Sequence, residues 1–139
     1  MITVSINTAS KLLRISFLVG AITDGLAIIP MVFPRIGSVV FGGDSSKLGA
    51  EYRYAMGIGA SLMAGWTALL FWGAINPMER RDILILTLVP VVTGIIAATV
   101  NAVDNRVIRL SRVIPLWIHL GIVSILFVVS YVLSFRVAT

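Results

Sequence analysis

The stretch ILILTLVPVVTGIIAATVNAV, residues 83–103, carries no charged side chain and decides the fold class of this chain. A helix needs about 20 apolar residues to cross the roughly 30 Å hydrocarbon layer of a bilayer, and this stretch is long enough. Because unpaired backbone amides are too costly in lipid for an open extended segment, the stretch predicts a transmembrane helix.

Three further segments have the same character. Residues 54–78 and 113–135 contain no charge, and between Arg14 and Arg35 the only charged residue is Asp24. The sequence therefore predicts transmembrane helices at approximately residues 12–33, 54–75, 83–102 and 113–135.

The overall composition also indicates a membrane protein. Of the 139 residues, 58% are hydrophobic and 12% are charged, and the mean hydropathy is +1.03. A soluble domain of this length needs a polar surface, which so few charges do not cover. We expect one transmembrane domain over residues 1–139, located in the cell membrane and, more specifically, in a bacterial inner membrane.

The lengths of the connections predict how the helices are arranged. The second and third loops are short, so their flanking helices are expected to be antiparallel neighbours. This predicts an all-α fold, a four-helix transmembrane bundle with up-down-up-down topology. The longest loop, residues 34–52, is rich in turn residues and is either a plain connector or a lid.

Small residues spaced four apart predict where helices approach closely. In lipid, close backbone approach holds helices together, and small residues permit it. The pattern is strongest in the second predicted helix, and the other helices carry weaker examples. The glycines and serine in these patterns are Gly20, Gly25, Gly57, Ser61, Gly65, Gly94 and Gly121. The same spacing suits packing inside one bundle and packing in a homodimer.

The scarcity of certain residue types excludes several kinds of chemistry. The chain has no cysteine, which excludes thiol–disulfide oxidoreductases, iron–sulfur proteins and structural zinc sites. A single histidine, His119, does not suffice for a bis-histidine haem or a multi-histidine metal site within one chain. The arginines behind the formal charge of +5 lie at helix ends, where they anchor to lipid headgroups, and no nucleic-acid partner is expected.

Asp24 is the most informative single residue. A carboxylate inside a transmembrane helix is costly and normally faces protein or water. Its helix neighbours Gly20, Ala21 and Ala27 are small, which puts Asp24 on a packing face. It is either a proton, cation or ligand site, or a buried structural partner of an arginine or tyrosine, and both interpretations are open.

Antiparallel helices bring further polar side chains to the same half of the bilayer as Asp24. The candidate ligand-binding or proton site comprises Asp24, Arg53, Tyr54, Asn101, Trp117 and His119. Arg53 is the candidate counter-ion of Asp24. No catalytic residue and no metal ligand is assigned.

A second pattern runs through the middle of the chain and consists of Arg53, Gly57, Gly59, Gly65, Glu79, Arg80, Arg81 and Gly94. In these residues the chain resembles the small four-helix bacterial membrane proteins of the broad DoxX-like kind. The resemblance covers about half of the chain and rests on glycine spacing and one arginine. Some members of that group are associated with quinone-linked oxidation, so the resemblance implies a membrane redox subunit with a quinone as its cofactor.

Three functional classes follow, in order of preference. The first is a non-enzymatic small integral membrane protein that binds lipid or a small ligand, or an accessory subunit of a larger membrane complex. The second is a proton-coupled small-molecule transporter that uses Asp24 and acts as a dimer, by analogy with small multidrug transporters. The third is a quinone-linked membrane oxidoreductase subunit, although no nucleophile and base stand at a recognised spacing. Membrane lipids are the expected partners in each case.

Overall fold

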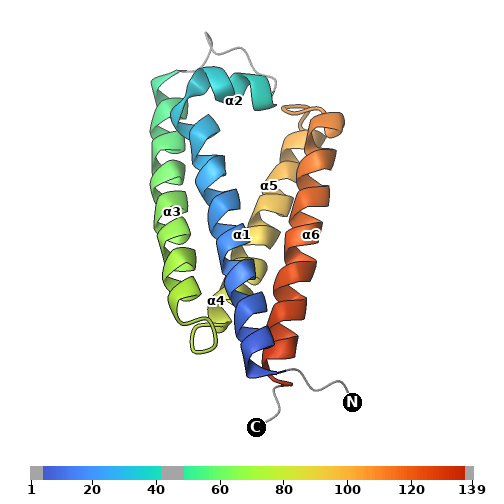
Figure 1. The fold of residues 1–139 in the computed structure, drawn as a ribbon. Coiled ribbons are helices and arrows are strands. Elements are labelled where there is room, and N and C mark those ends of the chain that lie inside the picture. The colour runs from blue at the N-terminus through green and yellow to red at the C-terminus, as the bar shows by residue number, and fades with distance from the viewer. Residues whose placement is uncertain (1–4, 42–48, 137–139) are drawn as a thin grey trace.

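The computed structural model describes residues 5–41 and 49–136, and over these ranges the chain consists of helices and short turns. Four helices are long and apolar enough to cross a membrane. They are α1 (Ile6–Val32), α3 (Ala50–Ile75), a third span made of α4 (Asp82–Leu86), η2 (Thr87–Val92) and α5 (Thr93–Asp104), and α6 (Leu110–Ser134) (Figure 1). The predicted all-α fold with four apolar helices is confirmed, and the protein is a multi-pass membrane protein.

Helices α1 and α3 both begin earlier than the apolar stretches alone predict. α1 begins at Ile6 rather than at residue 12, because the Ser5 hydroxyl accepts a hydrogen bond from the Thr8 backbone amide and caps the helix. α3 begins at Ala50 rather than at residue 54 and follows Gly49, whose backbone is extended. Capping and backbone conformation therefore set these helix starts, whereas apolar composition sets only the part that lies in lipid.

Neighbouring spans run antiparallel to one another. Gly20 of α1 lies against Leu70 of α3, and further along α1 Met31 lies against Gly59, nearer the start of α3. The hydrogen bonds between α1 and α6 follow the same reversed order. The start of α1 and the end of α6 lie at one end of the bundle, and the short helix α2 lies at the other (Figure 1).

The apolar core fills the end of the bundle near α4. Its buried side chains belong to Leu13, Phe17, Ala21, Leu70, Ala74, Ile83, Leu84, Val123 and Phe127. At the same end, the hydroxyls of Ser16 and Ser130 are both buried and lie 2.6 Å apart, which joins α1 to α6 by a hydrogen bond. Lipid gives no hydrophobic force between helices, so close packing and hydrogen bonds of this kind hold the spans together.

Side chains around the α3–α4 turn close this end of the bundle. The Arg80 guanidinium lies 3.6 Å from the centroid of the Trp72 ring and also donates to the Trp72 carbonyl. The Tyr131 hydroxyl of α6 donates to an Asp82 carboxylate oxygen at 3.1 Å. Cation–π contact and hydrogen bonding thus connect α3, the turn and α6 near the membrane boundary.

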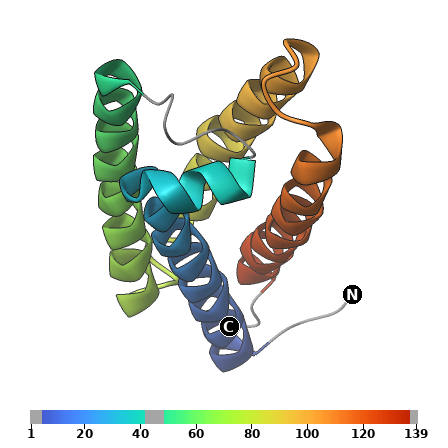
Figure 2. The same cartoon turned by 90° about the horizontal axis from the view of Figure 1, so that it is seen from above.

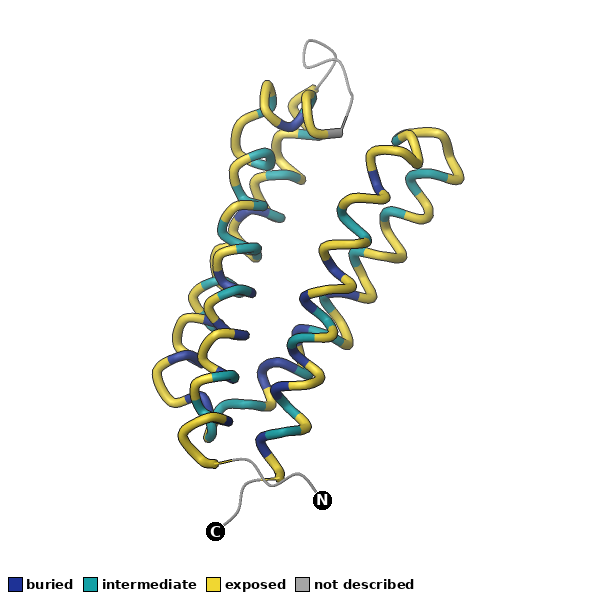
Figure 3. The backbone as a smooth tube through the Cα atoms, turned by 45° about the vertical axis from the view of Figure 1, so that its right-hand side comes forward, coloured by how far each residue is buried: buried dark blue, intermediate teal, exposed yellow. Residues whose placement is uncertain are grey.

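Toward the other end, the spans separate into two pairs, α1 with α3 and α5 with α6 (Figure 3). Buried residues are concentrated in the half near α4, and within Thr93–Asp104 of α5 none is buried. The indole Nε1 of Trp117 donates to the Thr99 hydroxyl at 2.9 Å and joins α6 to α5. The bundle is therefore closed at the α4 end and open between the pairs at the α2 end.

The predicted longest loop contains a helix, so the prediction of a loop over residues 34–52 is wrong in its first part. α2 spans Pro34–Phe41. Phe33 is extended, with φ −107° and ψ 97°, and separates α2 from α1. Proline is favoured in the first turn of a helix, where its missing amide is not needed, so Pro34 begins α2 instead of merely ending α1. Residues 42–48 lie outside the described residues, and the lid or connector interpretation of that part stays a prediction.

Helix α2 lies across the open end of the bundle. Seen from above, it extends from the end of α1 over the space between the two helix pairs (Figure 2). Gly37 lies close to the Pro30 carbonyl of α1, where a β-carbon would come within 2.6 Å of that oxygen. The absence of a side chain at Gly37 therefore allows α2 to fold back onto the end of α1.

Pro90 lies within η2, where the third span widens into a π-helical turn. Proline has no amide hydrogen to donate and its ring crowds the preceding turn, and a wider turn relieves both problems. The Thr87 hydroxyl at the start of η2 accepts a hydrogen bond from Nε1 of Trp66 at 3.2 Å. This bond fixes the irregular segment to α3.

The small-residue patterns predict the packing faces only in part. Gly20 is correct, because a β-carbon there would lie 2.7 Å from the Phe127 ring. The seam predicted at Gly57, Ser61 and Gly65 does not pack inside the bundle, since a β-carbon at Gly57 or Gly65 would meet nothing within 4 Å, and its alternative, packing in a homodimer, stays a prediction. Gly73, which the spacing does not mark, is the tightest position, because a β-carbon there would lie 2.5 Å from the Phe17 ring. Helix rotation, which spacing alone does not define, accounts for the difference.

Candidate ligand cavity

A cavity of about 320 Å³ lies between the two helix pairs on the side of α2. Five helices and the turn before α6 contribute to its wall. The lining residues are Ala27, Pro30, Met31, Val40, Met63, Ile95, Thr99, Ile108, Arg112, Val113 and Leu116. Nearly all of them are apolar, so the cavity suits an apolar or amphipathic ligand.

Thr99 and Arg112 are the polar side chains in the cavity wall. The Thr99 hydroxyl is already engaged, because it donates to the Ile95 carbonyl at 2.9 Å and accepts from Trp117 at 2.9 Å. Arg112 is exposed, as is Val40, and these residues form the outer edge of the cavity next to α2. Arg112 is therefore the polar group that an entering ligand meets first.

Arg112 also connects α6 to α2. Its Nη1 donates to the Val39 carbonyl at 2.6 Å and to the Val40 carbonyl at 3.5 Å. Within the described part of the chain, its Nε and Nη2 make no hydrogen bond. A guanidinium has five N–H donors, so Arg112 holds α2 over the cavity and keeps donors for a further acceptor.

Asp24 lies below the inner end of the cavity. It precedes the cavity residue Ala27 by one helical turn and shares a face of α1 with it. Asp24 Oδ2 and Thr67 Oγ1 are buried and have no hydrogen-bond partner among the residues that the structure describes. Thr67 of α3 packs against Gly25, next to Asp24. Buried polar atoms without partners are costly in a bilayer, which distinguishes Asp24 and Thr67 from buried polar side chains such as Ser16 and Ser130, whose hydroxyls are paired.

His119 and Trp117, two further residues of the predicted site, lie at the same depth of the bundle. His119 Nε2 and the Thr23 hydroxyl are 3.2 Å apart, and this hydrogen bond joins α6 to α1 beside Asp24. Trp117 bonds to the cavity residue Thr99. The hydrogen bonds of His119 and Trp117 therefore join α6 to α1 and α5 near the level of Asp24, although none of these three side chains lines the cavity and His119 is exposed.

Arg53, Tyr54 and Asn101 lie elsewhere. Asn101 is exposed near the end of α5, and its side-chain oxygen accepts from Asn105 at 2.6 Å. Asp24 and Arg53 both belong to the described residues and no ion pair joins them, so the predicted counter-ion relation is wrong. Arg53 instead lines a depression on the outer face of α3, together with Tyr54, Gly57, Ile58, Ser61 and Leu62. The rotation of α3 turns these side chains away from α1.

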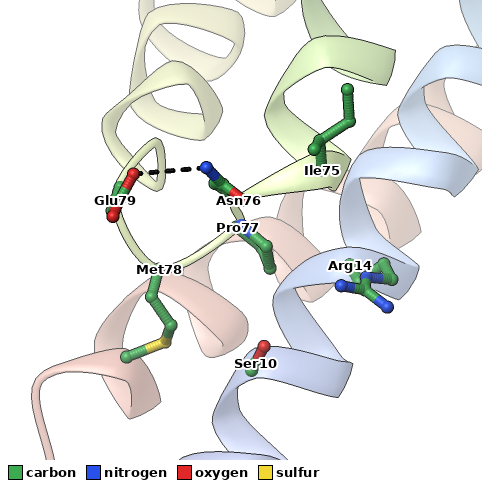
Figure 4. A pocket seen from close by; sticks show the side chains of 7 residues that line it. All are labelled: Ser10, Arg14, Ile75, Asn76, Pro77, Met78 and Glu79. Carbon is green, nitrogen blue, oxygen red and sulfur yellow. Dashed lines mark hydrogen bonds between the residues drawn. The ribbon is translucent and has the colours of Figure 1, made fainter.

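A second pocket, of about 270 Å³, lies at the closed end of the bundle (Figure 4). It is lined by Ser10, Arg14, Ile75, Asn76, Pro77, Met78 and Glu79. Arg14 Nε donates to the Ala74 carbonyl at 3.2 Å, and the Asn76 amide donates to Glu79 at 3.4 Å. These polar groups hold α1 and the turn after α3 together, and we assign them a structural role.

Most residues of the cavity wall cannot be recognised as cavity residues from the sequence. In the sequence, Met31 and Met63 look the same as lipid-facing residues, because both kinds are apolar and lie within transmembrane stretches. The position of Arg112 at a helix end indicates only an anchoring charge. The one available signal is its spacing, since Arg112 and Leu116 are four residues apart and so share a face of one helix.

The fold and the site define a class of protein: a helical multi-pass membrane protein with an apolar cavity between two helix pairs. Comparison with protein-family models, curated proteins and solved structures finds no match to this chain, and the resemblance to DoxX-like proteins stays a prediction. In the described ranges, no three histidine, aspartate or glutamate side chains gather closely enough to hold a metal ion. The functional assignment therefore depends on the cavity and the groups around it.

Proposed function

We propose that this protein is a non-enzymatic membrane protein that binds a lipid or another small apolar ligand in the cavity between its helix pairs. The observation that supports the proposal is the cavity itself, of about 320 Å³ with an almost wholly apolar wall. Apolar walls with a few placed polar groups are typical of small-ligand sites.

The size of the cavity limits the ligand. Ligand pockets range from about 300 to 1,000 Å³, and this one is near the lower limit. It suits one hydrocarbon chain or one ring system rather than a whole two-chain lipid. A quinone, with its ring and apolar tail, also belongs to this class of ligand, as does an acyl chain from the bilayer.

Native mass spectrometry of the protein, extracted gently from its own membrane, tests the proposal. We expect the wild type to carry a bound molecule whose mass identifies it. Ala27→Leu puts a larger side chain into the cavity wall and should lower the bound fraction about tenfold or more, because overpacked sites exclude ligand. Ala68→Leu makes the same change at an exposed position of α3 and should leave the bound fraction unchanged.

Two results would contradict the proposal. One is wild-type protein that stays free of ligand when lipid and quinone are added. The other is an equal loss of ligand in Ala27→Leu and Ala68→Leu, which would mean that the ligand binds the outer surface. Circular dichroism of both variants establishes that they keep the helical fold.

A proton-coupled small-molecule transporter is the second candidate, and the buried, unpartnered oxygen of Asp24 favours it. Asp24→Asn should then abolish proton-coupled uptake by vesicles that contain the protein. Coupled uptake that persists in Asp24→Asn would remove Asp24 from the mechanism. Ligand bound without any uptake would favour the binding function over transport.

The proposed location is a bacterial inner membrane. Outer-membrane proteins of bacteria are mostly β-barrels, whereas the spans of this protein are apolar helices. Fractionation of the two membranes of an expressing bacterium, followed by detection of the tagged protein, tests the location. Recovery in the outer-membrane fraction would contradict it.

A further inference from the structure

We propose that the cavity takes one acyl chain of an anionic phospholipid from the surrounding bilayer and that Arg112 binds the phosphate of its headgroup. The inference rests on the proposed ligand-binding function and adds the class of ligand and the residue that selects it. Three features support it: the geometry of Arg112, the arginines around the cavity mouth and the carboxylate of Asp24 beyond the inner end.

Among the described residues, Arg112 keeps donors of the kind that a phosphate needs. Its Nη1 bonds to the Val39 and Val40 carbonyls, and among the described residues Nε and Nη2 have no acceptor. The planar guanidinium binds a phosphate through two parallel N–H donors, so Nε and Nη2 match two phosphate oxygens. The hydrogen bond from Nη1 to the Val39 carbonyl holds the side chain in place. It leaves the edge of the guanidinium that carries Nε and Nη2 available to a phosphate.

Among the described residues at this end of the bundle, arginines outnumber the acidic side chains, which are Glu51 and Asp104. Arg109 precedes α6, Arg106 lies in the same turn, and Arg35 opens α2. Arg112 itself lies in the first turn of α6, where the helix dipole and unpaired amides favour a negative group. This combination attracts an anionic headgroup to the mouth more strongly than a zwitterionic one.

The interior of the cavity favours entry of the acyl chain and not of the headgroup. Below the mouth the wall is apolar down to the level of Asp24, which lies one turn beyond Ala27. The Asp24 carboxylate beyond the inner end of the cavity repels an anionic headgroup. The headgroup therefore stays at the mouth of the cavity. Because the cavity has room for one chain only, the second chain of the phospholipid stays in the bilayer outside the helix pairs.

The test uses the full-length protein in a neutral detergent, with native mass spectrometry as the readout. Dioleoyl phosphatidylglycerol and dioleoylglycerol, which share their chains and differ in the presence of the phosphate headgroup, compete at equal concentration. We expect the wild type to bind the anionic lipid at least about tenfold more tightly, the difference that one charge-assisted contact gives. Arg112→Gln should remove most of this preference, and Arg112→Lys should keep part of it.

Arg109→Gln is the matched control, since it removes the same charge from the same turn at a residue that does not line the cavity. Arg109→Gln should weaken the general attraction to the mouth and lower the preference far less than Arg112→Gln does. An equal loss in Arg109→Gln and Arg112→Gln would show general charge attraction and overturn the assignment to Arg112. The comparison of the two lipids on wild-type protein decides the headgroup question even where Arg112→Gln fails to fold.

The outcomes separate this inference from the function on which it rests. Equal binding of the two lipids, lost in Ala27→Leu, would overturn the headgroup proposal and leave the cavity as a ligand site. A free fatty acid or quinone that is retained and is not displaced by the anionic lipid would also overturn it. Binding of neither lipid, with no other ligand retained, would overturn both proposals.

Discussion

The Arg112 guanidinium of α6 donates a hydrogen bond to the Val39 carbonyl near the end of α2, over a distance of 2.6 Å. This contact crosses the open end of the bundle and joins two residues that are 73 positions apart, about half of the chain. Arg112→Ala should therefore loosen α2. A hydrogen bond to a charged group contributes about 1.5–3 kcal/mol, so amide exchange in Pro34–Phe41 should accelerate roughly tenfold or more.

Hydrogen–deuterium exchange of the protein in nanodiscs measures this effect. Arg109→Ala is the control and should leave exchange in α2 unchanged. Unchanged protection of α2 in Arg112→Ala would show that contacts with α1 alone hold α2 in place.

Asp24 provides a second prediction, because its buried oxygen has no partner to lose. Asp24→Asn should leave the free energy of unfolding unchanged or raise it by about 1–3 kcal/mol, since a charge inside the bilayer is removed. Thermal unfolding in detergent measures the change. Asp104→Asn, at an exposed position, should alter the free energy of unfolding by no more than about 0.5 kcal/mol. A marked loss of stability in Asp24→Asn would mean that Asp24 has a structural partner.

The closest helix contact gives a third prediction. A β-carbon at Gly73 would lie 2.5 Å from Phe17, which is fully buried in the core. Gly73→Ala should lower the free energy of unfolding by about 1–3 kcal/mol through overpacking. Gly121→Ala is the control, because nothing lies within 4 Å of that position and alanine favours the helix. Equal stability of the two variants would contradict the packing of α1 on α3.

The buried contact between Ser16 and Ser130 gives a fourth prediction. A double-mutant cycle with Ser16→Ala and Ser130→Ala should show a coupling energy of about 0.5–1.5 kcal/mol, the usual range for hydrogen bonds between membrane helices. Unfolding of all four proteins in the same detergent measures it. A coupling energy near zero would mean that the two hydroxyls do not interact.

The membrane-spanning fold follows from the sequence because it depends on one strong physical requirement. A run of about 20 uncharged residues has to be helical in lipid, whatever its neighbours are. The helix over Pro34–Phe41 is different, since it lies outside the apolar stretches and depends on Pro34 and on contact with α1. Its existence is decided by local backbone chemistry and packing that hydropathy does not record.

The candidate site is less predictable from the sequence because it depends on helix rotation. Thr23, the residue before Asp24, bonds to His119 because of the faces that α1 and α6 turn toward one another, whereas Arg53 faces outward from α3. Successive side chains of a helix point about 100° apart, so neighbouring positions can face the bundle interior or the lipid. Spacing patterns do not identify which face of a helix is turned inward. The same reason explains why the spacing at Gly57 suits the bundle interior and a homodimer equally, although in the structure a β-carbon there meets nothing within 4 Å.

The central claim, that the cavity holds an apolar chain, is tested most directly by photo-crosslinking in a bilayer. A phospholipid that carries a diazirine in its acyl chain is activated in vesicles with the full-length protein, and the labelled residues are located by peptide mass spectrometry. We expect label on the cavity residues Met31, Met63 and Leu116, and less label on them in Ala27→Leu. Labels confined to outward-facing residues such as Leu62 and Ile122 would contradict it.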